Sequence, residues 1–380
     1  MVDGYREAYI ATISAYSTQM DLAKRYTIGS KFFPSAASLL FLSVSTVATF
    51  SMMLSSLMLM NVADASPSPT EGADNSTESH SSFANSTTYE LVSEWGSEGD
   101  DDGQFVRPHD LDFSPSEDKL YIVDRDNNRI QVFDKNGTFL FKWGEDGDGE
   151  GDFALPYGLD VDREGNVWVA DRGNNRVQKF DADGNFLLTF GSEGEGEGEF
   201  RELRHVGVDD QLQYVYAVDS DNHRIQKFDI NGNFVESFGE LGDAPGQFDV
   251  PVTIVIDSKG DLFVNERGNE RVQKLDTQGN PILMWGGKGS GQSQFCHSEH
   301  LVVDKYDNIY VADPQSDPGC SLEASVKKFD NNGKFITMWR VLPAGEREAD
   351  PEHLAIDSEG NVYISERGNH RIQVYKPVLE

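Results

Sequence analysis

One four-part pattern recurs from residue 89 to the end of the chain, and it limits the fold more than any other feature. Its clearest copy runs from Pro156 to Gly191 as four short apolar runs bounded by Gly, Asn or Asp. Such runs predict four strands joined by tight turns. The third strand of each copy ends at Phe133, Phe180, Phe228, Leu275, Phe329 and Tyr375. Six copies of four strands predict an all-β, six-bladed β-propeller with four-stranded antiparallel blades.

The two ends of the repeat array complement each other. The sixth copy stops after its third strand, at Tyr375, whereas the segment from Tyr89 to Gly96 has the form of a fourth strand. We therefore expect the N-terminal strand to close the last blade and the ring, in one domain spanning 89–380. The fifth copy differs from the others because it carries an insertion between its second and third strands, over 314–325.

The segments Asp171–Phe180 and Glu366–Tyr375, with the Trp-Gly or Phe-Gly signature of the fourth strands, resemble NHL repeats. The resemblance extends over six in-register copies and implies a six-bladed propeller. The NHL-repeat family includes RNA-binding, protein-binding and enzymatic members, so the fold alone does not give the function. The net charge of −33 would repel a phosphate backbone, which excludes nucleic acid as a partner.

The N-terminal part predicts a membrane-linked segment. Residues 1–31 read as a short cytoplasmic segment, and 32–62 as a hydrophobic helix that spans a membrane or serves as a signal h-region. The run from Ser35 to Val62 is uncharged and follows Lys24, Arg25 and Lys31, which places the rest of the chain outside. Ala63-Asp64-Ala65 resembles a signal cleavage site, so retention and secretion both stay open. A buried core helix is a third alternative, which the lack of amphipathicity disfavours.

Residues 63–88 are rich in Ser and Thr and poor in large apolar residues, which predicts a disordered stalk. Three glycosylation sequons begin at Asn75, Asn85 and Asn136. Two of the three fall in the predicted stalk. They agree with a protein displayed at the cell surface or secreted.

An acidic residue precedes an arginine by five positions in five blades, across the loop between the second and third strands. A ring of charged ligand groups is one interpretation. Repetition in five blades favours structural bridges that hold each loop, because binding sites are usually asymmetric. The residues are Asp124, Arg129, Asp171, Arg176, Asp219, Arg224, Glu266, Arg271, Glu366 and Arg371.

Five blade-joining loops have the same length, and the first three are acidic. Flexible loops rich in carboxylates suit calcium, which prefers oxygen ligands. No loop has the residue order of an EF-hand, and a solvated charged rim is the alternative. The candidate calcium ligands are Glu98, Asp100, Asp101, Asp102, Glu145, Asp146, Asp148, Glu150, Asp152, Glu193, Glu195, Glu197 and Glu199.

The first strand of each blade lines the channel of a propeller, and one aligned position supplies a candidate zinc site. The column reads Asp110, Gly158, His205, Thr253, His300 and His353. Neutral imidazoles of His205, His300 and His353 could converge on zinc, although they come from unequally spaced blades. Histidines bonded to neighbours or water are the alternative.

One enzyme family with this repeat, the peptidylglycine amidating lyases, is similar in holding zinc in its channel through histidines of the first strands. In that family the histidine follows a proline directly. Here only Pro108-His109 has this form, so the resemblance carries over one residue. The equivalent positions in the other blades hold Tyr157, Arg204, Val252, Glu299 and Glu352.

The only two cysteines, Cys296 and Cys320, both belong to the fifth copy. They are expected to emerge on the same face of the blade, which makes a disulfide plausible outside the cell. Ser325 stands where other blades have arginine, so we expect the bridge between strands two and three to be missing there.

These features favour a non-catalytic binding or scaffold propeller for a protein, glycan or cation ligand. Its expected binding face carries the acidic loops and the insertion of the fifth copy. The alternative is a metal-dependent lyase or hydrolase, with its site in the central channel. A third interpretation is a surface protein that calcium stabilises without further ligand recognition.

Overall fold

The computed structural model describes residues 88–209, 211, 213–314, 323–343, 345 and 347–378. The predicted membrane or signal segment, most of the predicted stalk, Asn75, Asn85 and Cys320 lie outside these residues. No helix in the described part of the chain is long and apolar enough to cross a membrane.

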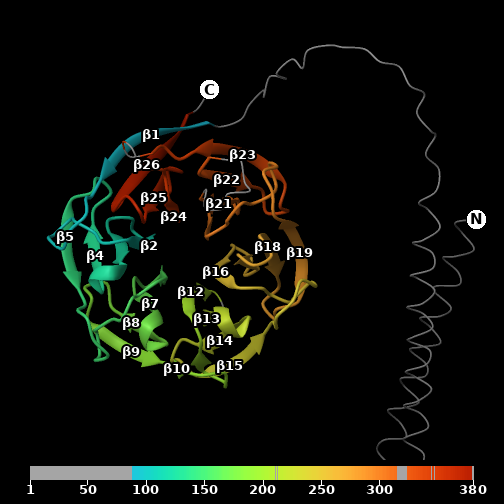
Figure 1. Cartoon of the computed structure of the whole chain (residues 1–380). Helices are drawn as coiled ribbons and strands as arrows, with labels where there is room; N and C mark the ends of the chain where they lie inside the picture. Colours follow the sequence, from blue (N-terminus) through green and yellow to red (C-terminus); the bar gives the residue numbers. More distant parts are fainter. Residues whose placement is uncertain are drawn as a thin grey trace, which may run out of the picture. The chain divides into compact units, whose positions relative to one another are not determined.

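Six four-stranded antiparallel sheets surround a common axis, as Figure 1 shows. Blade one contains β2 (Pro108–Phe113), β3 (Leu120–Asp124), β4 (Arg129–Phe133) and β5 (Phe139–Trp143). Blade two contains β6 (Leu159–Val161), β7 (Val167–Asp171), β8 (Arg176–Phe180) and β9 (Phe186–Phe190). Blade three contains β12 (Leu203–Asp209), β13 (Tyr214–Asp219), β14 (Arg224–Asp229) and β15 (Phe234–Phe238). The chain is therefore an all-β propeller, as predicted.

Blade four contains β16 (Pro251–Ile256), β17 (Leu262–Glu266), β18 (Arg271–Leu275) and β19 (Pro281–Gly286). Blade five contains β20 (His300–Val303), β21 (Ile309–Asp313), β22 (Ser325–Phe329) and β23 (Phe335–Arg340). Blade six contains β24 (Pro351–Ile356), β25 (Val362–Glu366), β26 (Arg371–Val378) and β1 (Thr88–Trp95). The short pair β10 (Ser192–Glu193) and β11 (Glu199–Phe200) is parallel, and three 3-10 turns follow second strands: η1 (Arg125–Asn127), η2 (Arg172–Asn174) and η3 (Ser220–Asn222).

Strand β1 closes the ring, as the sequence predicts. It pairs antiparallel with β26, from Thr88 opposite Val378 to Trp95 opposite Ile372. In Figure 1 the blue β1 accordingly lies on the outside of the red blade six. This pairing joins the two ends of the array, so no blade is left with three strands.

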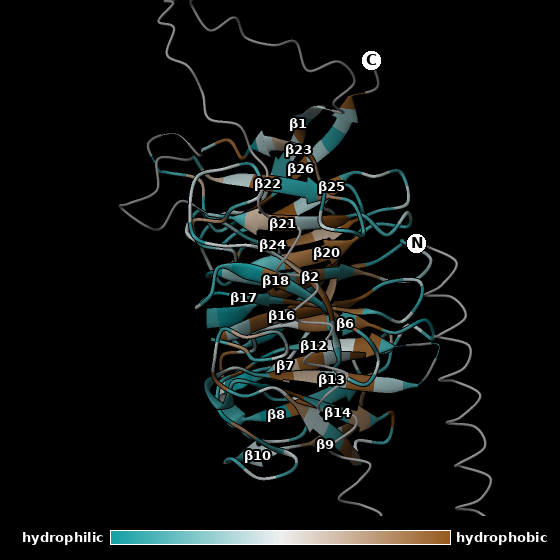
Figure 2. Cartoon of the chain, turned by 90° about the vertical axis from the view of Figure 1, so that its right-hand side faces the viewer, coloured by the Kyte–Doolittle hydropathy of each residue, from teal (hydrophilic) through white to brown (hydrophobic). Residues whose placement is uncertain are grey.

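The hydrophobic core lies between neighbouring blades. One cluster, for example, joins Tyr121 and Val123 of blade one to Leu159 and Val167 of blade two. Hydrophobic residues accordingly concentrate in the strands of Figure 2, while much of the loop surface is hydrophilic. Blade-joining loops end on a buried phenylalanine, and at Gly144 (φ +95°) a Cβ atom would lie 2.5 Å from the Phe153 ring. Glycine there permits the close packing that fixes the loop.

The repeated acid–arginine pairs fasten these loops. Arg129 Nε donates to Asp124 at 2.7 Å, and its other nitrogens donate to the carbonyl oxygens of Asp100, Asp101 and Gln104. Equivalent bonds join the other four pairs, at Asp171–Arg176, Asp219–Arg224, Glu266–Arg271 and Glu366–Arg371. Each pair therefore bridges β-strands and loop as a structural contact.

Blade five corrects the expectation that its bridge is missing. Lys327 Nζ lies 2.6 Å from Asp313 Oδ2 and also donates to the carbonyl of Gln294. Lys327 occupies the place that Gln131 takes in blade one, two residues beyond the usual arginine. A long cation at this neighbouring inward position thus replaces the arginine that Ser325 lacks.

Candidate functional site

Irregular pairing at the start of the first strands brings two consecutive residues of a strand into one buried cluster. The register shifts between Pro108 and Leu111 in β2, between Leu203 and His205 in β12, and between Pro351 and His353 in β24. Such bulges re-aim side chains. The residues placed there are all buried: His109, Asp110, Arg204, His205, Glu352 and His353.

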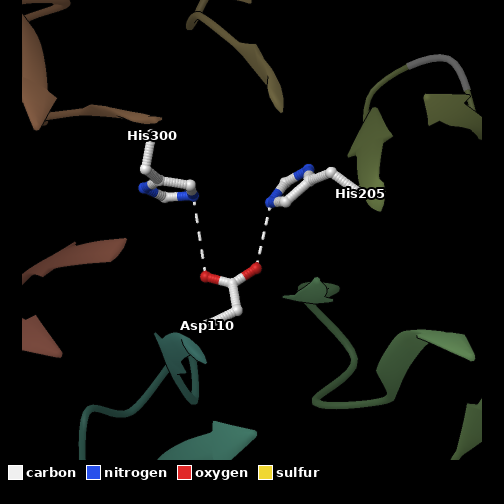
Figure 3. Close-up of side chains that lie close together, drawn as sticks. All are labelled: Asp110, His205 and His300. Carbon is white, nitrogen blue, oxygen red and sulfur yellow. Dashed lines mark ion pairs between the residues drawn. The ribbon is translucent and has the colours of Figure 1, made fainter. Parts of the chain in front are cut away.

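Asp110 is the centre of this cluster. His205 Nε2 lies 3.1 Å from Asp110 Oδ2, and His300 Nε2 lies 3.6 Å from Oδ1 (Figure 3). The ligand atoms of these three residues all lie within 4.8 Å of one another. His353 completes the cluster, with Nδ1 2.9 Å from Asp110 Oδ1. The structure thus brings together the three predicted histidines, from blades three, five and six, and adds the carboxylate of Asp110 from blade one.

Backbone amides hold the Asp110 carboxylate in place. The N–H of Leu111 donates to Oδ1 at 2.8 Å, and the N–H of Leu159 in the next blade donates to Oδ2 at 2.7 Å. Burial alone would raise the pKa of Asp110, but His353, His300 and hydrogen bonds from the histidines hold this pKa well below its usual value. Asp110 is therefore an ionised, positioned oxygen donor.

The histidine nitrogens lie close to this carboxylate but are not all satisfied by it. His300 Nε2 is buried and has no hydrogen-bond partner among the described residues, because Asp110 Oδ1 lies 3.6 Å away. Burial, together with the neighbouring His353, holds the pKa of His300 well below its usual value, so His300 is neutral. Neutral imidazoles and a carboxylate are the donors that zinc and similar divalent ions prefer.

One contact tests how well His300 fits a metal. The N–H of Leu354 donates to His300 Nδ1 at 3.2 Å, which puts the proton of the neutral ring on Nε2. Ligation through Nε2 would move that proton to Nδ1 and end this hydrogen bond. The donor types and their spacing fit a metal ion, and binding would be coupled to a local change at Leu354.

A second layer lies against this cluster. The His109 ring lies 4.2 Å from that of His353 and 3.7 Å from that of Tyr157, between ring centres. His109 Nδ1 is 3.0 Å from the Tyr157 carbonyl oxygen, and Nε2 is 3.2 Å from Glu352 Oε1. Burial holds the pKa of His109 well below its usual value; burial and the nearby Glu299 raise that of Glu352. Glu352 Oε1 also accepts a hydrogen bond from Arg367 Nη1 at 2.6 Å, so one oxygen lies between the neutral His109 ring and a cation.

A cavity of about 190 Å³ borders the cluster and extends along the first strands. Its walls include Asp110, His205 and His300, and further along it the pair Asp112 and Asp160. Burial raises the pKa of Asp112 to about 7 and that of Asp160 well above its usual value. These two carboxyl groups share a proton. Their combined negative charge is therefore smaller than that of two carboxylates, and it attracts a cation less strongly.

The acidic loops do not form a comparable site. No three of their carboxylates converge in the part of the chain that the structure describes. Asp102 pairs with Lys142 at 2.7 Å and Glu195 with Arg201 at 2.5 Å, while a cavity of about 430 Å³ adjoins the second loop at Glu145, Glu150 and Asp152. Calcium binding by these loops stays a prediction.

The remaining predicted residues lie apart from the cluster around Asp110. Cys296 is buried and disulfide-bonded, while Cys320 belongs to the segment outside the described residues. Asn136 is exposed in the turn between β4 and β5, where a glycan would be accessible.

Sequence reasoning missed Asp110, His109 and Glu352 as members of one site. Asp110 stands in the same aligned column as the histidines, so a search for oxygen as well as nitrogen ligands could have found it. His109 and Glu352 share the preceding column, where residue types vary from blade to blade. That variation is the available signal, because a scaffold position would repeat.

Comparisons with known proteins agree with this architecture. A family profile described as a 6-bladed beta-propeller matches residues 98–181 and 164–240, and the NHL repeat profile matches residues 349–375. Together with the six blades, the first match supports a β-propeller, and the second identifies an NHL repeat in blade six. No curated protein matches the sequence.

Solved structures with the same fold show which proteins the chain is similar to. A protein of unknown function from Bacteroides thetaiotaomicron is 17% identical, with 76% of each chain covered and a TM-score of 0.58. A streptogramin B lyase is 13% identical, with 76% of this chain and 98% of that chain covered and a TM-score of 0.53. A catalytically inactive virginiamycin B lyase from Staphylococcus aureus with quinupristin is 12% identical, with 77% and 99% covered and a TM-score of 0.53. At these identities the likeness establishes the fold alone.

Proposed function

We propose that the protein is a metal-dependent lyase or hydrolase with its centre in the central channel. The observation that carries this proposal is the cluster around Asp110, which gathers His205, His300 and His353 from three other blades. The buried Nε2 of His300 lacks a hydrogen-bond partner among the described residues, and a buried polar atom without a partner costs free energy. A bound divalent ion would satisfy this atom.

In this proposal Asp110 and His205 hold the ion, together with His300 or His353. A divalent ion there would act as a Lewis acid toward a substrate oxygen. Asp110 stays ionised and in position because two backbone amides bind it. The site is buried, so substrate groups that enter it leave bulk water, which strengthens electrostatic interactions inside.

The residues packed against this cluster, His109, Tyr157 and Glu352, supply groups that can hold a proton. Glu352 Oε1 lies 3.2 Å from His109 Nε2 and 2.6 Å from Arg367 Nη1; the pKa of Glu352 is raised, whereas that of His109 is lowered, so the ring is neutral. Such a pair can deliver a proton to a leaving group or take one up. Burial raises the pKa of Tyr157 to about 12, so its hydroxyl stays protonated and can donate a hydrogen bond.

The class of reaction rests partly on analogy. Two of the similar structures are named lyases, streptogramin B lyase and virginiamycin B lyase, which shows that this fold can carry such an activity. Their low identity carries no substrate or residue to this chain. We also propose that the propeller works outside the membrane, because Cys296 is disulfide-bonded and such bonds persist in oxidising compartments.

Elemental analysis of the purified full chain tests the proposal. We expect about one divalent transition-metal ion per chain, and a loss of most of it in a His205→Ala variant. The matched control is Asp112→Asn, which changes a half-buried carboxylate of the same strand that also accepts from backbone amides but lies outside the cluster. A stable protein that takes up no metal would instead support a non-catalytic binding propeller. A metal-loaded protein then goes into a lyase and hydrolase screen.

A further inference from the structure

Three arginines converge on Tyr157 beside the cluster around Asp110. The guanidinium carbons of Arg125, Arg172 and Arg204 lie 5.7, 5.4 and 5.5 Å from the centre of the Tyr157 ring. They come from η1, η2 and β12, in three consecutive blades. Three cations around one aromatic ring repel each other, so an arrangement of this kind needs negative charge nearby.

Arg204 contacts no carboxylate directly. It is 8% exposed and forms no ion pair among the described residues, although Glu202 and Glu299 interact with it electrostatically at longer range. Its only side-chain hydrogen bond in that part of the chain goes from Nη1 to the Tyr157 hydroxyl oxygen at 3.4 Å, and its buried Nε has no partner. A buried guanidinium normally has a paired anion, because an uncompensated buried charge is costly.

The neighbouring arginines are better compensated. Arg172 forms two bonds to the carboxylate of Glu202, and Arg125 lies 3.2 Å from Asp126, although Arg125 Nε is buried without a partner. Two buried guanidinium nitrogens, Nε of Arg125 and Nε of Arg204, are therefore left without a hydrogen-bond acceptor, and an anion would supply one.

The position of these groups gives them access to a ligand. Arg125 and Arg172 keep 15% and 23% of their side chains exposed, whereas Arg204 lies deeper. Tyr157 in turn contacts the ring of His109, which contacts that of His353 in the metal-binding cluster. An anion held at Arg204 would thus be anchored two aromatic rings away from the proposed reaction centre.

We propose that Arg204, with Arg125 and the Tyr157 hydroxyl, forms a binding site for a carboxylate group of the substrate. A guanidinium matches the planar fork of a carboxylate through two parallel N–H bonds. This inference gives a substrate class to the proposed channel enzyme and rests on that function, but the anion site itself can be tested without metal.

The test measures the melting temperature of the full chain in sodium acetate and in sodium chloride at equal ionic strength. We expect acetate to raise the melting temperature by at least about 2 °C over chloride. Phosphate at the same ionic strength should give a smaller rise. The measurement is repeated in EDTA, where the rise should persist because arginines and not a metal bind the anion.

Two variants assign the site. Arg204→Met should lose the acetate effect, because it removes the guanidinium group that would bind the anion. Arg340→Met is the control: it removes the same charge from a half-exposed residue paired with Glu323, and it should keep the full acetate effect. If Arg204→Met does not fold, Arg125→Gln takes its place and should weaken the effect.

The outcomes separate the two proposals. The carboxylate site is overturned if the acetate effect is absent in the wild type, unchanged in Arg204→Met (or in Arg125→Gln where that variant replaces it), or smaller than the effect of phosphate. Absence of metal in the elemental analysis overturns the channel metalloenzyme and leaves the acetate result in EDTA unaffected.

Discussion

His205 Nε2 lies 3.1 Å from Asp110 Oδ2, which links the first strands of blades three and one across the ring (Figure 3). Contacts of this kind depend on closure of all six blades, because the two residues are distant in sequence and lie in non-adjacent blades. Closure by β1 thus brings about the cluster as well as the stability of the ring.

Gly158 makes room for His205. A Cβ atom at residue 158 would lie 2.6 Å from the Arg204 carbonyl oxygen and 2.8 Å from His205 Cα, both on the backbone. We expect Gly158→Ala to lower the free energy of unfolding by about 1–3 kcal/mol and to reduce bound metal by displacing His205. Chemical denaturation and elemental analysis measure the two effects.

Gly196→Ala is the control for this substitution. Its added Cβ would meet only the end of the flexible Glu199 side chain, at 3.0 Å. We expect a change within about 0.5 kcal/mol and full metal content. Equal effects of the two substitutions would mean that Gly158 has no special relation to the site.

Lys327 is expected to be essential for the stability of blade five. It is fully buried and pairs with the equally buried Asp313. Lys327→Met leaves that carboxylate unpaired and should cost about 3–5 kcal/mol of unfolding free energy in chemical denaturation. The double variant Lys327→Met with Asp313→Asn should recover part of this loss. Exposed Lys376→Met should have little effect, and a similar loss there would refute the specific role of the pair.

Glu202 gives a prediction about pH. Its hydrogen bond from Arg172 lowers the pKa of Glu202 from the usual value of 4.5. A carboxyl group with a lowered folded-state pKa stabilises the protein fully above pH 4.5 and loses this effect as the pH falls through the folded value. Glu202→Gln should therefore cost roughly 1 kcal/mol at pH 7, and the difference from wild type should shrink below pH 4.5.

The same variant also tests the charge balance at Tyr157. Removing the Glu202 charge releases Arg172, so the effect of acetate on the melting temperature should increase. Glu323→Gln, which breaks the exposed pair with Arg340, should change neither quantity. A pH-independent cost in Glu202→Gln would show that its role is packing and not charge.

The fold followed from the repeat because six copies of one four-strand pattern allow few other arrangements. Alignment of the copies also placed Asp110 and the three histidines in one column. It did not show that their side chains meet in one cluster. Alignment treats blades as equivalent and cannot show that irregular pairing in β2 and β24 adds His109 and Glu352 to the same site.

Two further features needed three-dimensional contacts. Lys327 reaches Asp313 from a position two residues beyond the missing arginine, which a fixed spacing does not detect. The absence of a carboxylate in direct contact with Arg204 is a property of its three-dimensional surroundings, which alignment of the copies does not show.

The most direct test of the central claim is anomalous X-ray scattering from crystals of the zinc-loaded protein, collected on both sides of the zinc absorption edge. We predict one strong peak at about 2.0–2.2 Å from Asp110 and His205, with His300 or His353 as a further ligand. An ordered channel without a peak in the presence of excess zinc would contradict the metal centre.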